Sequence, residues 1–344
     1  EINDISNPTF NNVQISYNEG GYYAIFIEDS SSPIFNNVEI SNNTGTINAS
    51  QCNNITFNNS TISNNYSENE SIFNIYDCDA YLNNVVFSNN TSQYTGIYIE
   101  NSEANLSDVT IKDNTSISGW GAPLSFLYSD AILNNINISN NNASAGIVIE
   151  ASNLNLYHGT LSNNQHNPLD PAQTFGVISS WRNSNINIIN SIIWGNEFAG
   201  SIMCMDDPYF QGCNYLSVNY SDIEGGFEGE GNIDADPLFN NDFTLSENSP
   251  CIDTGTADID GDGVDDITDF YGEAPDMGAV ESNYNPEQEN PGDLNGDGSV
   301  NIIDIVALVN IILNDLDSQG ADYNGDGTVN VIDVVALVQF VLNN

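Results

Sequence analysis

The stretch "FNNVEISNNTG" (residues 35–45) alternates apolar and polar side chains and then ends on a pair of asparagines. The same pattern returns as "LNNVVFSNNTS" (82–92), "LNNINISNNNA" (133–143) and "INIINSIIWGNE" (186–197). Successive copies are 22 to 32 residues apart, measured between the asparagines that end them. These are Asn18, Asn43, Asn65, Asn90, Asn114, Asn141, Asn164 and Asn196. A self-similar period of this length with short alternating runs is typical of a solenoid.

Each repeat has room for two or three short strands and shows no helical periodicity, which favours one coil of a parallel β-helix. The spaced leucines of a leucine-rich repeat are missing. Strands of successive coils then stack about 4.8 Å apart, and Val, Ile, Leu and Phe point into one continuous core. Asparagine suits the corners, because it tolerates left-handed backbone and its amide can pair with the same amide one coil away. The sequence therefore predicts a mainly β fold, a parallel β-helix, over residues 1–281.

This part of the chain, over residues 5–281, resembles the right-handed parallel β-helix repeat proteins of the pectin-lyase-like superfamily. Residues 219–255, "NYSDIEGGFEGEGNIDADPLFNNDFTLSENSPCIDTG", followed by "PDMGAVE" (275–281), also resemble the end of secreted microbial β-helix repeat proteins. The resemblance implies that they form the last coils and a cap. The superfamily contains lyases, hydrolases, adhesins and surface fibres, so it implies a fold and no single activity.

The composition is strongly acidic. The chain carries 48 Asp and Glu against 2 Lys and Arg, a formal charge of -46 at pH 7, while its hydrophobic content of 40% is ordinary for a folded protein. Nucleic acids and anionic membranes are bound through basic residues, so we expect neither as a partner, and cations are favoured instead. No apolar run approaches the roughly 20 residues that span a bilayer, so we expect no membrane insertion.

The cysteines predict disulfides and an extracellular or cell-surface location. Cys52 and Cys78 are one repeat apart and can meet on neighbouring coils, Cys204 and Cys213 bracket a short loop, and Cys251 is left over. No signal peptide is visible, so we expect a mature, processed chain. The sequons predict glycosylation where the host has the machinery, for example at Asn48, Asn54, Asn105 and Asn142.

The C-terminal region predicts two calcium loops. Residues 282–291, "SNYNPEQENP", are too polar for a core and predict a linker. They precede "DLNGDGSVNIID" (293–304) and "DYNGDGTVNVID" (322–333), which place oxygen ligands around a glycine at loop position 6. The predicted ligands are Asp293, Asn295, Asp297, Ser299, Asn301 and Asp304 in the first loop, and Asp322, Asn324, Asp326, Thr328, Asn330 and Asp333 in the second.

Two such loops, each running into an apolar helix, resemble a type I dockerin over residues 292–344. The resemblance implies two bound Ca²⁺ ions, calcium-dependent folding and docking onto a protein partner, commonly a cohesin. The aspartate at loop position 12 fits this family. Loop positions 10 and 11 depart from cellulosomal dockerins, because they hold Ile302-Ile303 and Val331-Ile332 and no basic residues follow.

A third loop, "DIDGDGVDDITD" (258–269), fits the same ligand pattern. It predicts a third Ca²⁺ site, and the alternative is a solvated acidic loop, because no helix follows it. Its predicted ligands are Asp258, Asp260, Asp262, Val264, Asp266 and Asp269, with Val264 contributing its backbone carbonyl.

Two columns on the rod suggest a saccharide groove, with Asp77 and Glu100 as a candidate acid and base pair on adjacent coils. The alternative is that these are outward positions that tolerate any polar residue. Lys112 and Arg182 are the only bases for a lyase, and we expect Arg182 to stack on Trp181 or to pair with a neighbouring acid. Acids end strands at Glu28, Asp77, Glu100 and Glu150, and aromatic residues recur at Tyr23, Tyr94, Trp120 and Phe175.

Two functions remain open. The first is a non-enzymatic structural rod, joined by its dockerin-like module to a partner. That partner is a cohesin-like module or the N-terminal end of another copy, which would give a fibre, because a repeat motif begins near Glu1 and leaves no sequence for a cap. The second is a dockerin-bearing protein of a cellulosome-like complex that binds or degrades a polysaccharide, as a lyase or a glycoside hydrolase.

Overall fold

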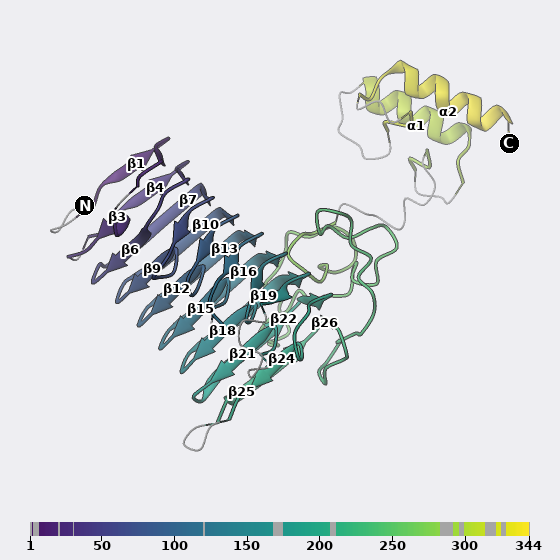
Figure 1. The fold of residues 1–344 in the computed structure, drawn as a ribbon. Coiled ribbons are helices and arrows are strands. Elements are labelled where there is room, and N and C mark those ends of the chain that lie inside the picture. The colour runs from purple at the N-terminus through teal and green to yellow at the C-terminus, as the bar shows by residue number, and fades with distance from the viewer. Residues whose placement is uncertain are drawn as a thin grey trace. The chain divides into compact units, whose positions relative to one another are not determined.

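The computed structural model describes residues 2, 7–19, 21–29, 31–119, 121–167, 175–206, 211–282, 292–295, 299–313, 321–324 and 328–343. The chain divides into two compact units, Glu1–Ser282 and Asn283–Asn344. The first is a parallel β-solenoid and the second is a small module with two helices, which confirms the fold class that the sequence predicts (Figure 1). Among the helices of the described residues, none has the length and apolar character needed to cross a membrane.

Three sheets with parallel pairing build the solenoid (Figure 1). The largest follows β1 (Thr9–Asn11), β4 (Ile34–Asn36), β7 (Asn54–Ser63), β10 (Asp79–Ser88), β13 (Glu103–Lys112), β16 (Asp130–Ser139), β19 (Asn153–Ser162), β22 (Ser184–Ile189) and β25 (Cys213–Asn219). It also includes β2 (Gln14–Ser16), β5 (Glu39–Ser41), β23 (Ile192–Trp194) and β26 (Asp222–Ile223).

The eight-stranded sheet consists of β3 (Tyr23–Ile27), β6 (Thr46–Ser50), β9 (Phe73–Tyr76), β12 (Ile97–Glu100), β15 (Leu124–Leu127), β18 (Ile147–Glu150), β21 (Ile178–Trp181) and β24 (Ile202–Cys204). The five-stranded sheet consists of β8 (Tyr66–Ser67), β11 (Thr91–Ser92), β14 (Thr115–Ser116), β17 (Asn142–Ala143) and β20 (Gln165–His166). Each strand pairs with its equivalent one repeat later, so the repeats of the sequence become coils.

The core is a set of like side chains stacked from coil to coil. Phe10, Phe35 and Phe57 share one column, and their ring centroids are 4.9 and 4.4 Å apart along it. Leu82 and Leu106 continue the column, and both are fully buried. Because every coil repeats the alternation of the opening motif, one coil's apolar face is always covered by the next.

The corners explain the paired asparagines. The first of each pair has left-handed backbone, with φ of 56° at Asn42, 55° at Asn64 and 56° at Asn89. Asparagine adopts this conformation at lower cost than most residues, because its short polar side chain can hydrogen-bond locally. The chain can therefore turn sharply at these corners without a glycine, whereas Gly195, with φ of 69°, takes this position before Asn196.

The second asparagine of each pair forms a buried ladder along the rod. The Oδ1 of Asn90 accepts hydrogen bonds from the backbone N–H and the Nδ2 of Asn65, at 2.9 and 3.0 Å. The Nδ2 of Asn90 donates to the carbonyl oxygen of Ile62 at 2.9 Å and to the Oδ1 of Asn114 at 3.0 Å. Both ends of the buried amide are thus satisfied by neighbouring coils, and the pattern continues at Asn18, Asn43, Asn141, Asn164 and Asn196.

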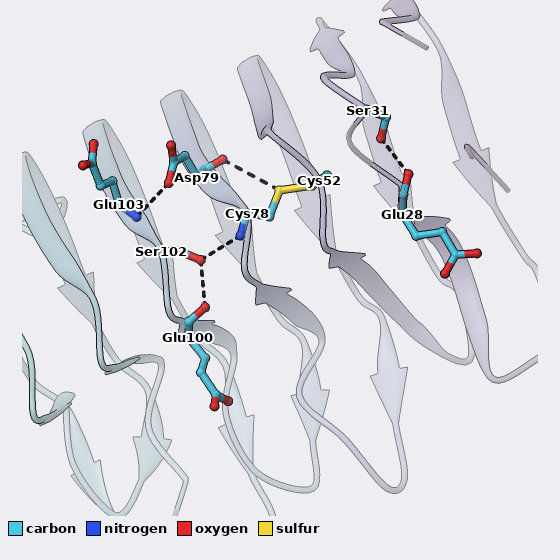
Figure 2. Close-up of a disulfide and its surroundings, with 8 residues drawn as sticks. All are labelled: Glu28, Ser31, Cys52, Cys78, Asp79, Glu100, Ser102 and Glu103. Carbon is cyan, nitrogen blue, oxygen red and sulfur yellow. Dashed lines mark hydrogen bonds between the residues drawn. A yellow bond between two sulfur atoms is a disulfide. The ribbon is translucent and has the colours of Figure 1, made fainter. Parts of the chain in front are cut away.

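Both predicted disulfides are confirmed. Cys52 and Cys78 join adjacent coils across a Cα distance of 4.8 Å, and Cys204 pairs with Cys213. Figure 2 shows that Ser102 takes the next place along this corner, where its Oγ accepts the N–H of Cys78 at 3.1 Å. Cys251 is free and buried.

Residues 224–282 form a closing segment that packs on the last coils. Thr256 exchanges two hydrogen bonds of 2.8 Å with the side chain of Asn190, and the N–H of Ala279 donates to the Oγ1 of Thr160 at 2.8 Å. Burial there lowers the pKa of His158 below its ordinary value of 6.5. Burial also raises the pKa of Asp222 to about 6, in a pair with the Cys251 thiol.

Breaking the asparagine ladder should destabilise the rod. Asn90→Ala leaves two buried donors of Asn65 without an acceptor, and each orphaned buried group costs about 1–3 kcal/mol, so we expect a loss of about 2–6 kcal/mol in the free energy of unfolding. The control Asn83→Ala removes an exposed amide contact on the same coil and should cost under about 0.5 kcal/mol. Urea unfolding of the two variants compares them directly, and equal losses would contradict the role of the ladder.

The buried His158 predicts a pH effect. Its pKa is lowered in the folded state, so protonation favours the unfolded state, and the stability tied to the neutral ring is present above pH 6.5 and is lost as the pH falls below that value. His158→Asn tolerates the φ of 51° at this position and cannot titrate. The stability of the wild type relative to this variant should therefore decline below pH 6.5. A constant difference between about pH 8 and pH 5 in urea titrations contradicts this account.

Candidate functional site

The two C-terminal loops end on helix caps. The N–H of Ile303 donates to the Oδ1 of Asn301 at 2.8 Å, which caps α1 (Ile302–Leu313), and the N–H of Ile332 donates to the Oδ1 of Asn330 at 2.8 Å, which caps α2 (Val331–Asn343). The caps fix where each loop stops and each helix begins. In the structure these two predicted ligands therefore serve the helices, and their contribution to a metal site stays a prediction.

A buried carboxylate closes each loop. The Asp304 side chain is fully buried and accepts the N–H groups of Leu294 at 2.8 Å, Asn295 at 3.2 Å and Asn301 at 2.8 Å. These contacts hold the beginning and the end of the loop together. Asp333 repeats the arrangement in the second loop, where it is also fully buried and accepts N–H groups of Asn324 and Asn330 at 3.1 and 2.8 Å.

The donors around these carboxylates suit a hard cation. Each predicted ligand offers oxygen, as Ca²⁺ requires, and residues 292–344 contain no Lys, Arg or His to neutralise Asp304 and Asp333. Asp293 is also buried. A buried carboxylate is costly without a positive partner, so the donor set fits a bound Ca²⁺. Asp297 and Asp326, both predicted ligands, lie outside the described residues, while Ser299, Thr328 and Asp322 lie in the described parts of their loops.

The third loop brings its first three acids together. The carboxylates of Asp258, Asp260 and Asp262 each offer an oxygen within 4.8 Å of the others. Asp258 accepts the N–H groups of Gly261 and Gly263, both at 2.8 Å, which tightens the turn. The other three predicted ligands are outside this cluster of acids. The Oδ2 of Asp266 accepts the N–H of Ile259 at 2.9 Å, and Val264 and Asp269 are exposed.

Each helix of the module exposes an apolar stripe. Ile302 and Ile303 are 69% and 56% exposed, and Val331 and Ile332, at the same positions of the second repeat, are 68% and 57% exposed. The opposite side of each helix packs into a small core around Leu308, Ala321 and Leu337. The stripes, called the exposed stripes below, comprise Ile302, Ile303, Val306, Val309 and Leu313 on α1, and Val331, Ile332, Val335, Phe340 and Leu342 on α2.

The strand register corrects the predicted acid column on the rod. Glu100 pairs with Tyr76 on the coil before it and with Leu127 on the coil after it, and Glu150 follows Leu127. Asp77 lies one residue beyond this column, at an exposed corner with φ of 50°, and its N–H donates to the carbonyl oxygen of Glu100 at 3.0 Å. The prediction that placed Asp77 and Glu100 in one column is therefore wrong. Figure 2 shows the Glu28 and Glu100 carboxylates pointing away from the disulfide corner.

A hollow of about 350 Å³ lies on the eight-stranded sheet. Arg182 forms an ion pair with Glu150 at 2.7 Å on its wall, which confirms the expected pairing with a neighbouring acid. The phenol of Tyr98 donates to the Glu100 carboxylate at 3.0 Å, and burial followed by this hydrogen bond raises the pKa of Tyr98. Tyr98 was not among the predicted site residues, although the alternation of buried and outward side chains along β12 places it outward.

The aromatic residues that recur along the rod differ in their exposure. Phe175 is buried and contacts Trp181 with ring centroids 5.5 Å apart, and Trp181 is the register partner of Glu150, so its ring lies beside the ion pair. Tyr23 and Tyr94 are 41% and 47% exposed. Trp120 lies outside the described residues.

Comparison with known proteins identifies the C-terminal module. Residues 291–342 match the family model of the dockerin type I domain. No curated protein and no solved structure gives a significant match to this chain. Dockerin type I domains generally bind calcium and dock onto cohesin partners, so this chain joins a calcium-binding, protein-binding module of that type to a β-solenoid.

Removing calcium should unfold the C-terminal helices. Without a cation the buried Asp304 and Asp333 carboxylates have no positive partner, whereas Ca²⁺ at about 100 times its Kd stabilises the folded module by about 2.7 kcal/mol. We expect EGTA to abolish most of the helical circular dichroism of the full chain and to leave the β signal. Asp304→Asn should weaken Ca²⁺ binding at least about tenfold. Asp113→Asn, an exposed acid on the rod, is the matched control, and an EGTA-insensitive helix signal contradicts the site.

Proposed function

We propose that this protein is a component of an extracellular or cell-surface assembly, in which the β-solenoid is attached to a partner by calcium-dependent docking of its dockerin-type module. The single observation behind this proposal is the pair of exposed stripes on a module that matches the dockerin type I family. The partner is a cohesin-like module. In this proposal the solenoid is the cargo, and the helical module is its attachment point.

The exposed stripes support an interface. Leu313 and Leu342 are 76% and 78% exposed at equivalent positions, and contiguous apolar surface of this kind marks a protein-protein contact. The module carries only acidic charge, since it has no Lys, Arg or His. Its partner should therefore present an apolar centre with a neutral or basic rim, because like charges across an interface cost binding energy.

Calcium connects the loops to this interface. We assign one ion to each C-terminal loop, with Asp304 and Asp333 as the ligands that close the loops, and a third ion to the three acids of the loop in the closing segment. Asp304 and Asp333 lie in the first turns of α1 and α2, close to Ile302 and Val331, where the exposed stripes begin. Binding of the ion would thus fix the first turn of each helix and, with it, the orientation of the exposed stripe. Two disulfides and dockerin-type attachment both favour the oxidising space outside the cell.

The docking surface can be tested with the intact chain. Ile303→Asp combined with Ile332→Asp should abolish Ca²⁺-dependent binding to a panel of recombinant cohesin modules, measured by calorimetry, because it places charge in the apolar centre. Ile132→Asp, on the exposed face of β16, is the matched control and should bind as the wild type does.

Sedimentation of the same proteins distinguishes the other occupant, a second copy of this chain. Calcium-dependent oligomers that disappear in the Ile303→Asp, Ile332→Asp variant, together with no cohesin binding, would replace the cohesin proposal with a head-to-tail fibre. A monomer that binds no cohesin contradicts both.

A second candidate function is favoured by the hollow on the eight-stranded sheet. Trp181 offers an aromatic face beside the Arg182–Glu150 ion pair, and Glu100 lies two coils from Glu150 in the same column. Aromatic faces with fixed polar groups suit a saccharide, and two carboxylates can cleave a glycosidic bond. A reducing-sugar assay on neutral and acidic polysaccharides tests cleavage. Loss of activity in both Glu100→Gln and Glu150→Gln supports an enzyme, and an inactive wild type removes it.

A further inference from the structure

A second groove lies on a different sheet, beside the closing segment. It has a volume of about 490 Å³ and is bounded by the outward face of β19, β22 and β25 and by residues 256–261 of the closing segment. The closing segment lies beside these strands in Figure 1. The hydrogen bonds between Thr256 and Asn190 hold this wall on the rod. These hydrogen bonds thus fix the shape of the groove.

We propose that this groove binds a neutral saccharide chain. The proposal starts from two amides on adjacent coils, Asn155 and Asn187, which are register partners and line the groove. Both are half-buried, and neither side chain makes a hydrogen bond to any residue in the described part of the chain. Two other asparagines of the groove, Asn153 and Asn185, pair with each other instead, through a 2.6 Å contact from the Nδ2 of Asn185 to the Oδ1 of Asn153.

The chemistry of these amides fits hydroxyl groups. A carboxamide offers two N–H donors and an oxygen acceptor in one plane, so it can donate to one sugar hydroxyl and accept from its neighbour. Asn155 and Asn187 lie one strand spacing apart, about 4.8 Å, close to the length of one pyranose ring. Two adjacent amides therefore match hydroxyls on one sugar or on two consecutive sugars.

Three tyrosines flank the amides. Tyr215, on β25, is the register partner of Asn185 and is 56% exposed. Tyr157 lies on β19, two residues after Asn155, and also lines the groove. Tyr220 lines the far side. Aromatic rings present flat apolar faces that pack on the C–H face of a pyranose, with a phenol at the edge for a hydrogen bond. A groove that combines amides with aromatic faces is suited to sugars better than to apolar ligands.

The charge of the groove selects among saccharides. Glu230, Asp258 and Asp260 line it, and no Lys or Arg does. A Ca²⁺ ion on the acids of this loop would offset two of their three charges, and the whole chain has a formal charge of -46, so uronate or sulfated chains are repelled with or without the ion. The ligand is therefore a neutral glycan. This site is separate from the hollow at Trp181, and it does not depend on the docking proposal, since binding is measured without a cohesin.

Calorimetry of the full chain in Ca²⁺ tests the proposal with defined probes. The neutral probes are xylohexaose, cellohexaose, mannohexaose and laminarihexaose, and the acidic comparator is hexagalacturonate. We expect binding of at least one neutral probe and none of hexagalacturonate. Asn155→Ala combined with Asn187→Ala should weaken that binding at least about tenfold, because two hydrogen bonds to the ligand are lost.

The matched control is Asn58→Ala combined with Asn83→Ala. These amides also lie on adjacent coils of the same sheet, but they pair with each other at 2.9 Å and do not line the groove. The control should bind as the wild type does. The proposal is overturned if no neutral probe binds, if the Asn155 and Asn187 substitutions leave affinity unchanged, or if Trp181→Ala removes the binding instead.

Discussion

One asparagine amide on each coil, buried from Asn43 to Asn164, holds the solenoid in register. The ladder from Asn18 to Asn196 links each coil to the next through side-chain and backbone hydrogen bonds of 2.7 to 3.1 Å. A buried amide that lacks a hydrogen-bond partner destabilises the fold, so both the asparagine and its position along the rod are constrained. This register determines which side chains stack in the core, which cysteines meet at the corner, and which outward residues align from coil to coil. The segments between ladder positions vary in length and form the loops that border the hollow on the eight-stranded sheet.

In the helical module, buried carboxylates have the role that buried amides have in the solenoid, because they also need partners for their polar atoms. Asp304 and Asp333 are buried and gather the backbone N–H groups of their loops, yet the module has no basic residue. A cation completes such a site, and the dockerin type I match is consistent with calcium. The exposed stripes begin at the same helix ends. Folding of the loops and presentation of the docking surface are therefore one event in this account, and the acidic composition makes both depend on the metal.

Much of this could be predicted from the sequence, because the repeats are local. The spacing of asparagines predicted the coils, and the positions of Cys52 and Cys78 predicted their disulfide. The column containing Asp77 was misplaced, since a one-residue difference at a corner decides which side chains align across coils, and spacing alone does not reveal it. The groove at Asn155 and Asn187 was invisible for a related reason. It needs the closing segment to return to β19 and β22, a contact between residues far apart in the chain.

Hydrogen exchange of the full chain tests the central claim, that calcium folds the module and a cohesin-like partner covers its stripes. We expect Ca²⁺ to protect the amides of α1 and α2, and the partner to add protection at the helix starts around Ile302 and Val331. The β-solenoid should exchange equally without Ca²⁺, with Ca²⁺, and with Ca²⁺ and the partner. Helices protected equally with and without Ca²⁺, or partner protection confined to the solenoid, would contradict this claim.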